Sequence, residues 1–211
     1  MGVLRRMYEL GVRMMTLTWN QKTSWQAPQR NPGGVLVPQT EKGLTGKGFE
    51  FLAEMERMHM IVDVSHLSDK GFWDIVEHGT RPFAASHSNC RTLAPHTRNL
   101  TDEMIRALSE RGGIAGLNYY APFLDTDPTH PENCRSTVEL IAKHAGHYKQ
   151  VGGAQMIALG SDFDGIDGPH QLENAAFLPL LADALRKEGF TEDEVEGIYY
   201  RNAMRFFEEN L

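Results

Sequence analysis

Two histidines occupy matching positions, each directly after a short apolar run. His66 follows the run in "VDVSHLS" (62–68), and His87 follows the run in "FAASHSN" (83–89). Neutral imidazole is a common zinc ligand, and bound zinc lowers the pKa of water toward ~7 and polarises a carbonyl for hydrolysis. A single histidine at a strand end is more often a hydrogen-bonded structural residue. The repetition of the Ser-His phrase favours a metal site at His66 and His87.

Two aspartates follow the last apolar run, 156–164. Asp162 lies between Ser161 and Phe163 at the end of this run, so we expect it to be partly desolvated, as suits a group that exchanges protons. Asp164 precedes a glycine, and Asp-Gly is a turn signal. We therefore expect Asp162 to be functional and Asp164 to cap the turn.

Other polar side chains follow the remaining runs. Asn118 and Tyr119 end the run 112–120, and both are expected to contact a substrate. Arg98 lies just before a helix start, and a guanidinium there could grip a carboxylate through two hydrogen bonds. The alternative, an ordinary surface arginine, is what the position of Arg98 alone favours.

The elements that position these groups alternate between strands and helices. Five apolar runs are typical of strands buried on both faces of a parallel sheet; they cover residues 12–18, 60–66, 81–87, 112–120 and 156–164. Helix 46–59 shows an apolar face, and further helices are expected to start at Thr101 and, with capping boxes, at Ser136 and Thr191. Gly112 and Gly189 are expected to end helices. Residues 24–48 are expected to form one long loop. His144 and His147 are expected on an exposed face of helix 136–151.

Strict alternation leaves an open doubly wound sheet or a (β/α) barrel. The chain has neither a G-x-G-x-x-G turn nor a P-loop, and its polar candidates gather at the carboxyl ends of different strands, as in barrels. We therefore predict an α/β fold with one domain over 1–211, a TIM-like (β/α) barrel. The barrel is incomplete, because it has five strand-helix units where eight are needed. Open sheet edges predict self-association or pairing with another chain.

Composition excludes several classes of protein. The 211 residues are 41% hydrophobic and 23% charged, with a formal net charge of −7, so no basic surface is expected for nucleic acid or an anionic membrane. No apolar stretch approaches the ~20 residues that span a bilayer. The start, "MGVLRRMYEL", is predicted to be an amphipathic helix and not a signal peptide. Two cysteines predict no disulfide framework and a cytoplasmic protein.

Linked phrases along nearly the whole chain resemble the zinc-dependent renal (membrane) dipeptidase family and its bacterial relatives. These phrases are "GVRMMTLTWN", "VDVSHLS", "FAASHSNCR" with "TRNLTDEMIRAL", "GGIAGLNYY" and "ALGSDFDGI". The resemblance implies a barrel with a two-zinc site that hydrolyses dipeptides. It implies that His66 and His87 bind one zinc ion. It also implies that Arg98 binds the substrate's carboxylate, and that Asp162 lies at the substrate's amino group and assists proton transfer.

The chain departs from the family pattern at its start. The family takes a His-x-Asp pair from its first strand and a zinc-bridging glutamate from its third, and the chain shows neither. Trp19 stands where some members carry a substrate-contacting histidine. The chain therefore resembles the C-terminal part of a dipeptidase, strands four to eight, with at most one zinc ion partly retained. Because catalytic zinc usually has three protein ligands, we expect little activity from the chain alone. A signal peptide would lie in the missing portion.

Two other functional classes stay open at the level of sequence. One is a different amidohydrolase-type metal hydrolase on the same barrel, although no lysine ends a strand here. The other is a catalytically inactive fragment, or a relic retained as a binding protein.

Overall fold

The computed structural model describes residues 1–18, 42–125, 133–166, 168 and 170–211. The chain divides into two compact units, which are considered separately: Met1–Ala84 with Phe207–Leu211, and Ala85–Phe206. The expectation of a single domain stays a prediction. Trp19 and most of the expected loop 24–48 lie outside the described residues.

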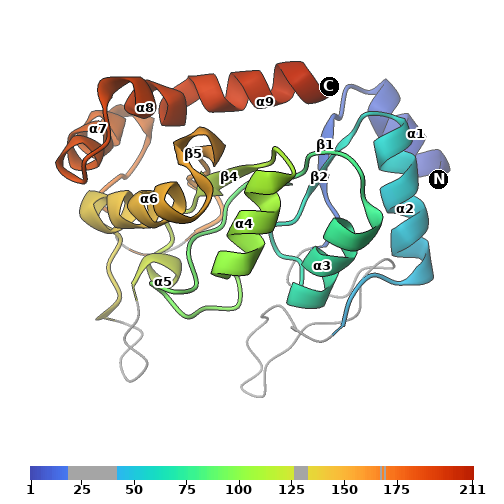
Figure 1. Ribbon diagram of the computed structural model, residues 1–211, viewed down its shortest axis with the longest axis horizontal. Coiled ribbons are helices and arrows are strands. Elements are labelled where there is room, and N and C mark those ends of the chain that lie inside the picture. The colour runs from blue at the N-terminus through green and yellow to red at the C-terminus, as the bar shows by residue number, and fades with distance from the viewer. Residues whose placement is uncertain (19–41, 126–132, 167, 169) are drawn as a thin grey trace. The chain divides into compact units, whose positions relative to one another are not determined.

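The first unit carries helices beside two parallel strands (Figure 1). Its elements are α1 (Gly2–Glu9), β1 (Met14–Thr16), α2 (Gly46–Arg57), β2 (Ile61–Asp63) and α3 (Asp69–His78). β1 pairs with β2 from Met14 opposite Ile61, and Asp63 of β2 pairs with Ala84, where β3 (Ala84–Ala85) begins. These strands lie within the runs predicted from the sequence and are shorter than predicted.

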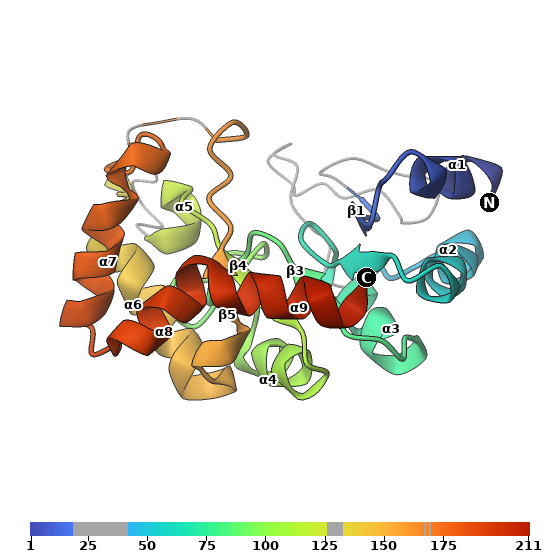
Figure 2. The ribbon, with the colours of Figure 1, turned by 90° about the horizontal axis from the view of Figure 1, so that it is seen from above.

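Helices α1 and α2 lie side by side in both ribbon views (Figures 1 and 2). Arg5 Nε of α1 lies 2.6 Å from Glu54 Oε1 of α2, and Arg57 also binds this carboxylate. The hydrogen bonds from Arg57 and Arg5 lower the pKa of Glu54 to about 2. Thr45 caps α2 by accepting the N–H of Gly48, so the helix starts inside the expected loop.

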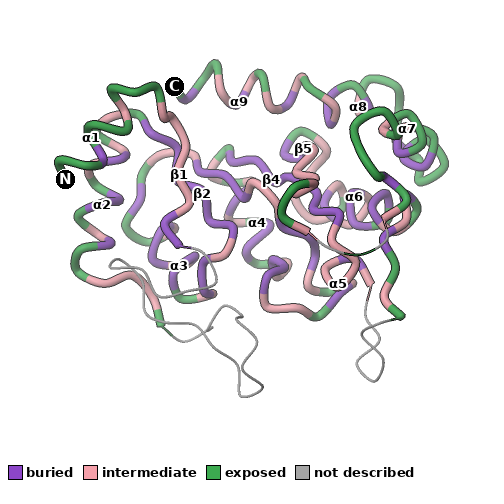
Figure 3. Tube along the Cα trace, turned by 180° about the vertical axis from the view of Figure 1, so that it is seen from behind, coloured by how far each residue is buried: buried purple, intermediate pink, exposed green. Residues whose placement is uncertain are grey.

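The second unit repeats the strand-helix alternation. Its elements are α4 (Asp102–Glu110), β4 (Ile114–Leu117), α5 (Ala121–Leu124), α6 (Val138–Gly152), β5 (Ile157–Leu159), α7 (Leu178–Lys187), α8 (Glu192–Glu196) and α9 (Asn202–Asn210), whose last residues belong to the first unit. β4 and β5 are parallel, with Leu117 opposite Leu159. Figure 3 shows buried residues (purple) all along β4, as a predicted core strand requires.

Backbones approach closely at the ends of β4 and β5. A Cβ atom on either Gly116 or Gly160 would overlap the carbonyl oxygen of Ser86, which follows β3. The N–H of Ser88 donates to Gly116 O at 2.9 Å, and Gly160 N–H donates to Leu117 O at 3.0 Å. Glycine is therefore needed at both positions for space. Because glycine has no side chain, the ends of β4 and β5 can approach the backbone that follows β3.

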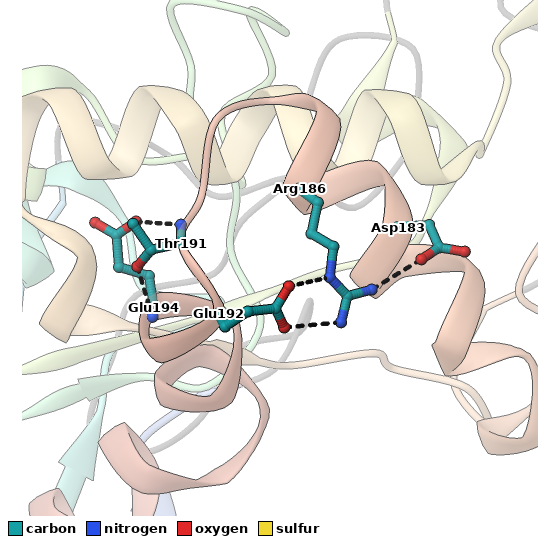
Figure 4. A network of polar contacts seen from close by, with 5 residues as sticks. All are labelled: Asp183, Arg186, Thr191, Glu192 and Glu194. Atoms are coloured by element: carbon teal, nitrogen blue, oxygen red, sulfur yellow. Dashed lines mark hydrogen bonds and ion pairs between the residues drawn. The ribbon is translucent and has the colours of Figure 1, made fainter.

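Helix boundaries follow the predicted signals with one correction. The predicted capping box at Ser136 is wrong: Thr137 is the N-cap of α6, because the Ser136 hydroxyl donates to Tyr119 O at 2.6 Å. The capping box at Thr191 is confirmed, with Thr191 and Glu194 exchanging hydrogen bonds (Figure 4). Gly112 and Gly189 follow α4 and α7 with φ of 72° and 92°, which confirms both helix stops.

A π-helical turn, Gly197–Arg201, joins α8 to α9. The Asn202 side chain that follows it donates through Nδ2 to Ala154 O at 2.9 Å and to Ile157 O at 2.8 Å. This amide ties the start of α9 to the start of β5. Phe206, one turn further along α9, is fully buried.

The helices are modest in length, and α6, with 15 residues, is the longest within the described ranges. None of the described helices combines the length and apolar composition that crossing a bilayer requires.

Candidate functional site

His66 lies in a sharp turn directly after β2. Val64 N–H still pairs with Ala84 O at 2.7 Å, whereas Leu67 N–H turns back to Val64 O at 3.0 Å. His66 between them has φ of 70°, the left-handed region that residues with a Cβ rarely adopt. Such strained residues cluster at functional sites, where the surroundings hold them in place. Among the described residues His59 and Asp162 share this backbone, so the role of His66 as a metal ligand stays a prediction.

The carboxylate of Asp63 holds this turn, and the sequence reasoning missed it. Asp63 is only 2% exposed and accepts hydrogen bonds from Ser65 N–H at 3.0 Å and from the Thr16 hydroxyl at 2.6 Å. The signal in the sequence was a lone acidic residue within the apolar run "MIVDVSH". A buried carboxylate needs such partners, so Asp63 is a positioning residue for the turn that carries His66.

His87 follows β3 in the second unit. Its ring nitrogen Nδ1 lies 2.7 Å from the hydroxyl oxygen of Ser86, and its side chain is half-buried. When one ring nitrogen of an imidazole binds a metal, a hydrogen bond at the other nitrogen orients the ring and selects its tautomer. Because His66 belongs to the first unit and His87 to the second, their convergence on one ion stays a prediction.

Among the described residues, another set of metal-competent side chains lies on α3. Asp74, Glu77 and His78 place their ligand atoms within 4.8 Å of one another. Asp74 already binds Lys70 and accepts the N–H of Leu44 at 2.7 Å, while Glu77 and His78 are exposed. Asp74 is therefore buried and engaged in local contacts, and its ion pair with Lys70 stabilises the helix.

Asp162 lies just beyond β5, and its carboxylate is hydrogen-bonded on one side. Its φ is 69°, so it shares the left-handed backbone of His66. Oδ2 accepts a hydrogen bond from Asn118 Nδ2 at 3.1 Å. Oδ1 faces Gly165, where an added Cβ would come within 2.5 Å of it, and Gly165 N–H closes the turn on Asp162 O at 3.0 Å. Asp164 is exposed in this same turn, in line with its expected turn role.

Asn118 is completely buried and fully used by hydrogen bonds. Besides its bond to Asp162, its Oδ1 accepts the N–H of Tyr120 at 2.6 Å. Its backbone is held by Asn89, whose Oδ1 accepts Asn118 N–H at 3.0 Å and whose Nδ2 donates to Asn118 O at 2.9 Å. The carboxamide of Asn89 thus makes the two backbone hydrogen bonds that a neighbouring strand would make, at a point where β3 has ended. Asn89 was not among the predicted site residues, although it stands two positions after His87.

Arg98 is buried, 6% exposed, with its guanidinium carbon 5.4 Å from the centre of the Phe123 ring. The alternative of an ordinary surface arginine is therefore wrong. A second arginine fixes the backbone on both sides: Arg91 donates to Thr97 O at 3.1 Å and to Asn99 O at 2.8 Å. Arginines are rarely buried without a charged or polar partner. The binding of a substrate carboxylate by Arg98 stays a prediction.

His96 supports Arg98 as a neutral imidazole. Burial, and then the charges of Arg98 and Arg91, lower the pKa of His96 to about 4. Its Nδ1 accepts the backbone N–H of Arg98 at 3.1 Å, and its ring lies 4.6 Å from that of Phe123. The imidazole therefore adds no charge to compete with the guanidinium.

Asn99 links the Arg98 loop to the Asn89–Asn118 pair. Its Oδ1 accepts Asn89 N–H at 3.2 Å, and its Nδ2 donates to Phe123 O and Ala94 O, both at 2.9 Å. The carbonyl of Phe123 also accepts from Asn89 Nδ2 at 3.2 Å. Three buried asparagines thus connect the segments that carry Arg98 and Asp162.

Tyr119 is fully buried, and its ring packs edge-on against Phe163 at 5.4 Å. Burial raises the pKa of its phenol, which has no hydrogen-bond partner within the described part of the chain. A substrate contact for Tyr119 stays a prediction. What the structure shows is a packing support for Phe163, the neighbour of Asp162.

The expectation for His144 is wrong, because its side chain is fully buried. The imidazole bonds to two backbone segments: Cys90 N–H donates to Nδ1, and Nε2 lies 3.1 Å from Leu124 O. His147, one turn on, pairs with Asp102 at 2.8 Å and is half-buried. Neither histidine belongs to a metal cluster among the described residues.

Comparisons with known proteins give one consistent result. The family model "Membrane dipeptidase (Peptidase family M19)" matches residues 1–210. An uncharacterized Klebsiella pneumoniae protein is 35% identical over 204 residues, covering 96% of this chain and 73% of its own length. An uncharacterized dipeptidase of Schizosaccharomyces pombe is 34% identical over 97% of this chain but only 48% of its own.

Solved structures agree with the sequence matches. A metallopeptidase from Rhodobacter sphaeroides, crystallised with a phosphinate mimic of the dipeptide L-Ala-D-Ala, is 31% identical and superposes with a TM-score of 0.87. The match covers 99% of this chain and 59% of that one. The predicted α/β class is confirmed: five parallel strands alternate with helices and correspond to part of the barrel.

Proposed function

Because the chain belongs to the membrane dipeptidase family, peptidase family M19, we propose that it serves in zinc-dependent hydrolysis of dipeptides. The chain spans about half to three fifths of the length of several relatives, so the activity of a complete dipeptidase is part of this proposal. The observation that carries it is that the second unit holds a buried arginine, Arg98, and a carboxylate, Asp162, that Asn118 hydrogen-bonds. The side chains of Asn99, Asn89 and Asn118 link the segments that carry the two charges.

Two opposite charges in one unit suit the two ends of a dipeptide. Arg98 would grip the terminal carboxylate with its planar fork of donors, as the family resemblance implies. Asp162 would take the terminal ammonium group and accept or return a proton at its carboxylate during cleavage. Because each group is held by buried neighbours, little ordering would be needed when the substrate binds.

Imidazole nitrogens are donors that suit a zinc ion. In the tautomer whose Nδ1–H donates to the Ser86 hydroxyl, Nε2 of His87 would carry the lone pair that a metal takes. His66 would be the second ligand, held by the turn that Asp63 organises. A bound zinc ion would activate water and polarise the scissile carbonyl. Two histidines are fewer than the three protein ligands of most catalytic zinc sites, so weak zinc binding and low turnover are proposed for this chain alone. Its two free cysteines support a reducing compartment such as the cytoplasm.

Zinc titration by calorimetry, run alongside a dipeptide hydrolysis assay with L-Ala-L-Ala, tests the proposal. We expect one zinc site, weakened at least tenfold by His87→Ala or His66→Asn. His78→Ala, on the exposed face of α3, is the matched control and should leave zinc binding unchanged. Zinc binding that survives both substitutions would refute the assignment of ligands. A chain that binds zinc through both histidines but never cleaves the dipeptide would support the alternative of a catalytically inactive relic.

A further inference from the structure

The buried asparagines between Arg98 and Asp162 have a shared geometry that the predicted roles do not explain. Asn118 was expected to contact the substrate, yet its side chain is completely buried and bonds to Asp162 Oδ2 and Tyr120 N–H. Its backbone N–H and C=O both bond to the carboxamide of Asn89. A residue committed in this way acts on its neighbours and not directly on a ligand.

We propose that Asn118 and Asn89 are positioning residues that set the orientation of the Asp162 carboxylate. This rests on the proposed function for the identity of the substrate, though not for the geometry. Asn89 fixes the backbone of Asn118, and Asn118 Nδ2 donates to Oδ2 of Asp162. This bond selects one orientation of the carboxylate, whose terminal torsion is otherwise broad.

The backbone of Asp162 supports this reading. With φ at 69°, the residue is in a conformation that residues with a Cβ rarely adopt. Gly165 has no left-handed φ, and the first atom that an added Cβ would meet is Oδ1 of Asp162, so a side chain there would displace the carboxylate. Misplacement of a reacting group by about 1 Å can lower a rate by 10²-fold.

The same network reaches the cation. Asn99 Oδ1 accepts Asn89 N–H, and Asn99 directly follows Arg98. The segment that carries Arg98 is thus tied to the segment that carries Asp162 by amide hydrogen bonds among buried residues of one unit.

The first arm of the test needs neither zinc nor turnover. The chain is labelled with 13C at aspartate carboxyl carbons, and the Asp162 resonance is assigned by its loss in Asp162→Asn. Asn118→Ala and Gly165→Ala should both shift this resonance. Asn202→Ala, which removes another buried amide of the same unit, is the matched control for lost stability and should leave it in place. The proposal would be overturned if Asn118→Ala left the chemical shift of the Asp162 carboxyl carbon unchanged. It would also be overturned if Asn202→Ala changed this chemical shift by the same amount.

The second arm measures hydrolysis of L-Ala-L-Ala with zinc. Asn118→Ala should lower kcat by about 10- to 100-fold with a smaller change in KM, and it should add no loss in an Asp162→Ala background. Equal losses in both backgrounds would show that Asn118 acts independently of Asp162 and would overturn the proposal. If the unmodified chain cleaves no dipeptide, the proposed function of the isolated chain fails, while the resonance shifts still decide the positioning role.

Discussion

Cys90 donates its backbone N–H to Nδ1 of His144 across 3.1 Å, deep inside the second unit. The thiol of Cys90 in turn contacts His144 O at 3.4 Å, and burial raises the thiol's pKa. The imidazole therefore serves as a neutral bridge between the segment after β3 and helix α6. A nucleophilic role for Cys90 is disfavoured by the same burial.

Protonation of His144 should destabilise the fold on acidification. Burial lowers its pKa from 6.5 to about 4, so between these values the unfolded chain binds more protons than the folded one. The contribution of His144 is fully present above pH 6.5 and should fall by about 3 kcal/mol as the pH drops to 4. Burial lowers the pKa of His96 to about 4 as well, so its contribution is lost in the same pH range. Urea unfolding at pH 4.5 to 7.5 measures the sum. His144→Gln should remove about half of the dependence, and an unchanged slope would remove His144 as a cause.

The close approach of strand ends predicts severe effects at two glycines. Gly116→Ala and Gly160→Ala would each force a Cβ into the Ser86 carbonyl, and backbone cannot move aside cheaply. We expect each to lower the free energy of unfolding by at least about 3 kcal/mol. Gly46→Ala, at the start of α2 with open space around it, is the control and should be neutral or slightly stabilising. Urea unfolding curves of the three variants compare them directly.

Alanine variants are usually more stable than glycine variants. The left-handed backbone of His66 predicts the opposite order of stability at this position. His66→Gly should be more stable than His66→Ala by about 1 kcal/mol, because only glycine relieves the strain at φ of 70°. His59, with φ of 57° after the end of α2, should show the same order. Zinc affinity separates the two positions: variants at His66 should lose it and variants at His59 should keep it. Thermal unfolding without metal provides the stability comparison.

The polar contacts at the start of α8 should contribute unequally to the stability of the fold (Figure 4). Thr191→Ala removes the N-cap and should cost about 1 kcal/mol. Arg186 binds Glu192 through two bonds and also Asp183, yet all three side chains are well exposed. Arg186→Ala should therefore change the midpoint of thermal unfolding much less than Thr191→Ala. A larger effect of Arg186→Ala would mean that the ion pairs stabilise this region more than the N-cap of α8 does.

Much of the fold could be predicted because its signals are local. Apolar runs located β2, β4 and β5, and the capping box at Thr191 follows from four consecutive residues. Strand-end position then pointed to His66 and Asp162, and the structure gives both a strained backbone.

The supporting residues could not be predicted, because their partners are distant in sequence. Asn89 binds Asn118 from 29 positions away, and Cys90 meets His144 from 54 positions away. Helical spacing alone placed His144 on an exposed face, since periodicity cannot show which neighbour later covers a helix. Asp63 was passed over because one acidic residue in a strand looks like an interruption until Thr16 and Ser65 are brought to it.

The π-helical turn at Gly197–Arg201 sets the rotational phase of the last helix. Each residue in an α-helix advances the direction of the side chains by about 100°. Removing one residue from this turn would therefore swing Phe206 out of the interior and point a polar flank of α9 inward. Homologous chains that keep this helix packed must either preserve the extra residue or compensate for it with a second change of length nearby.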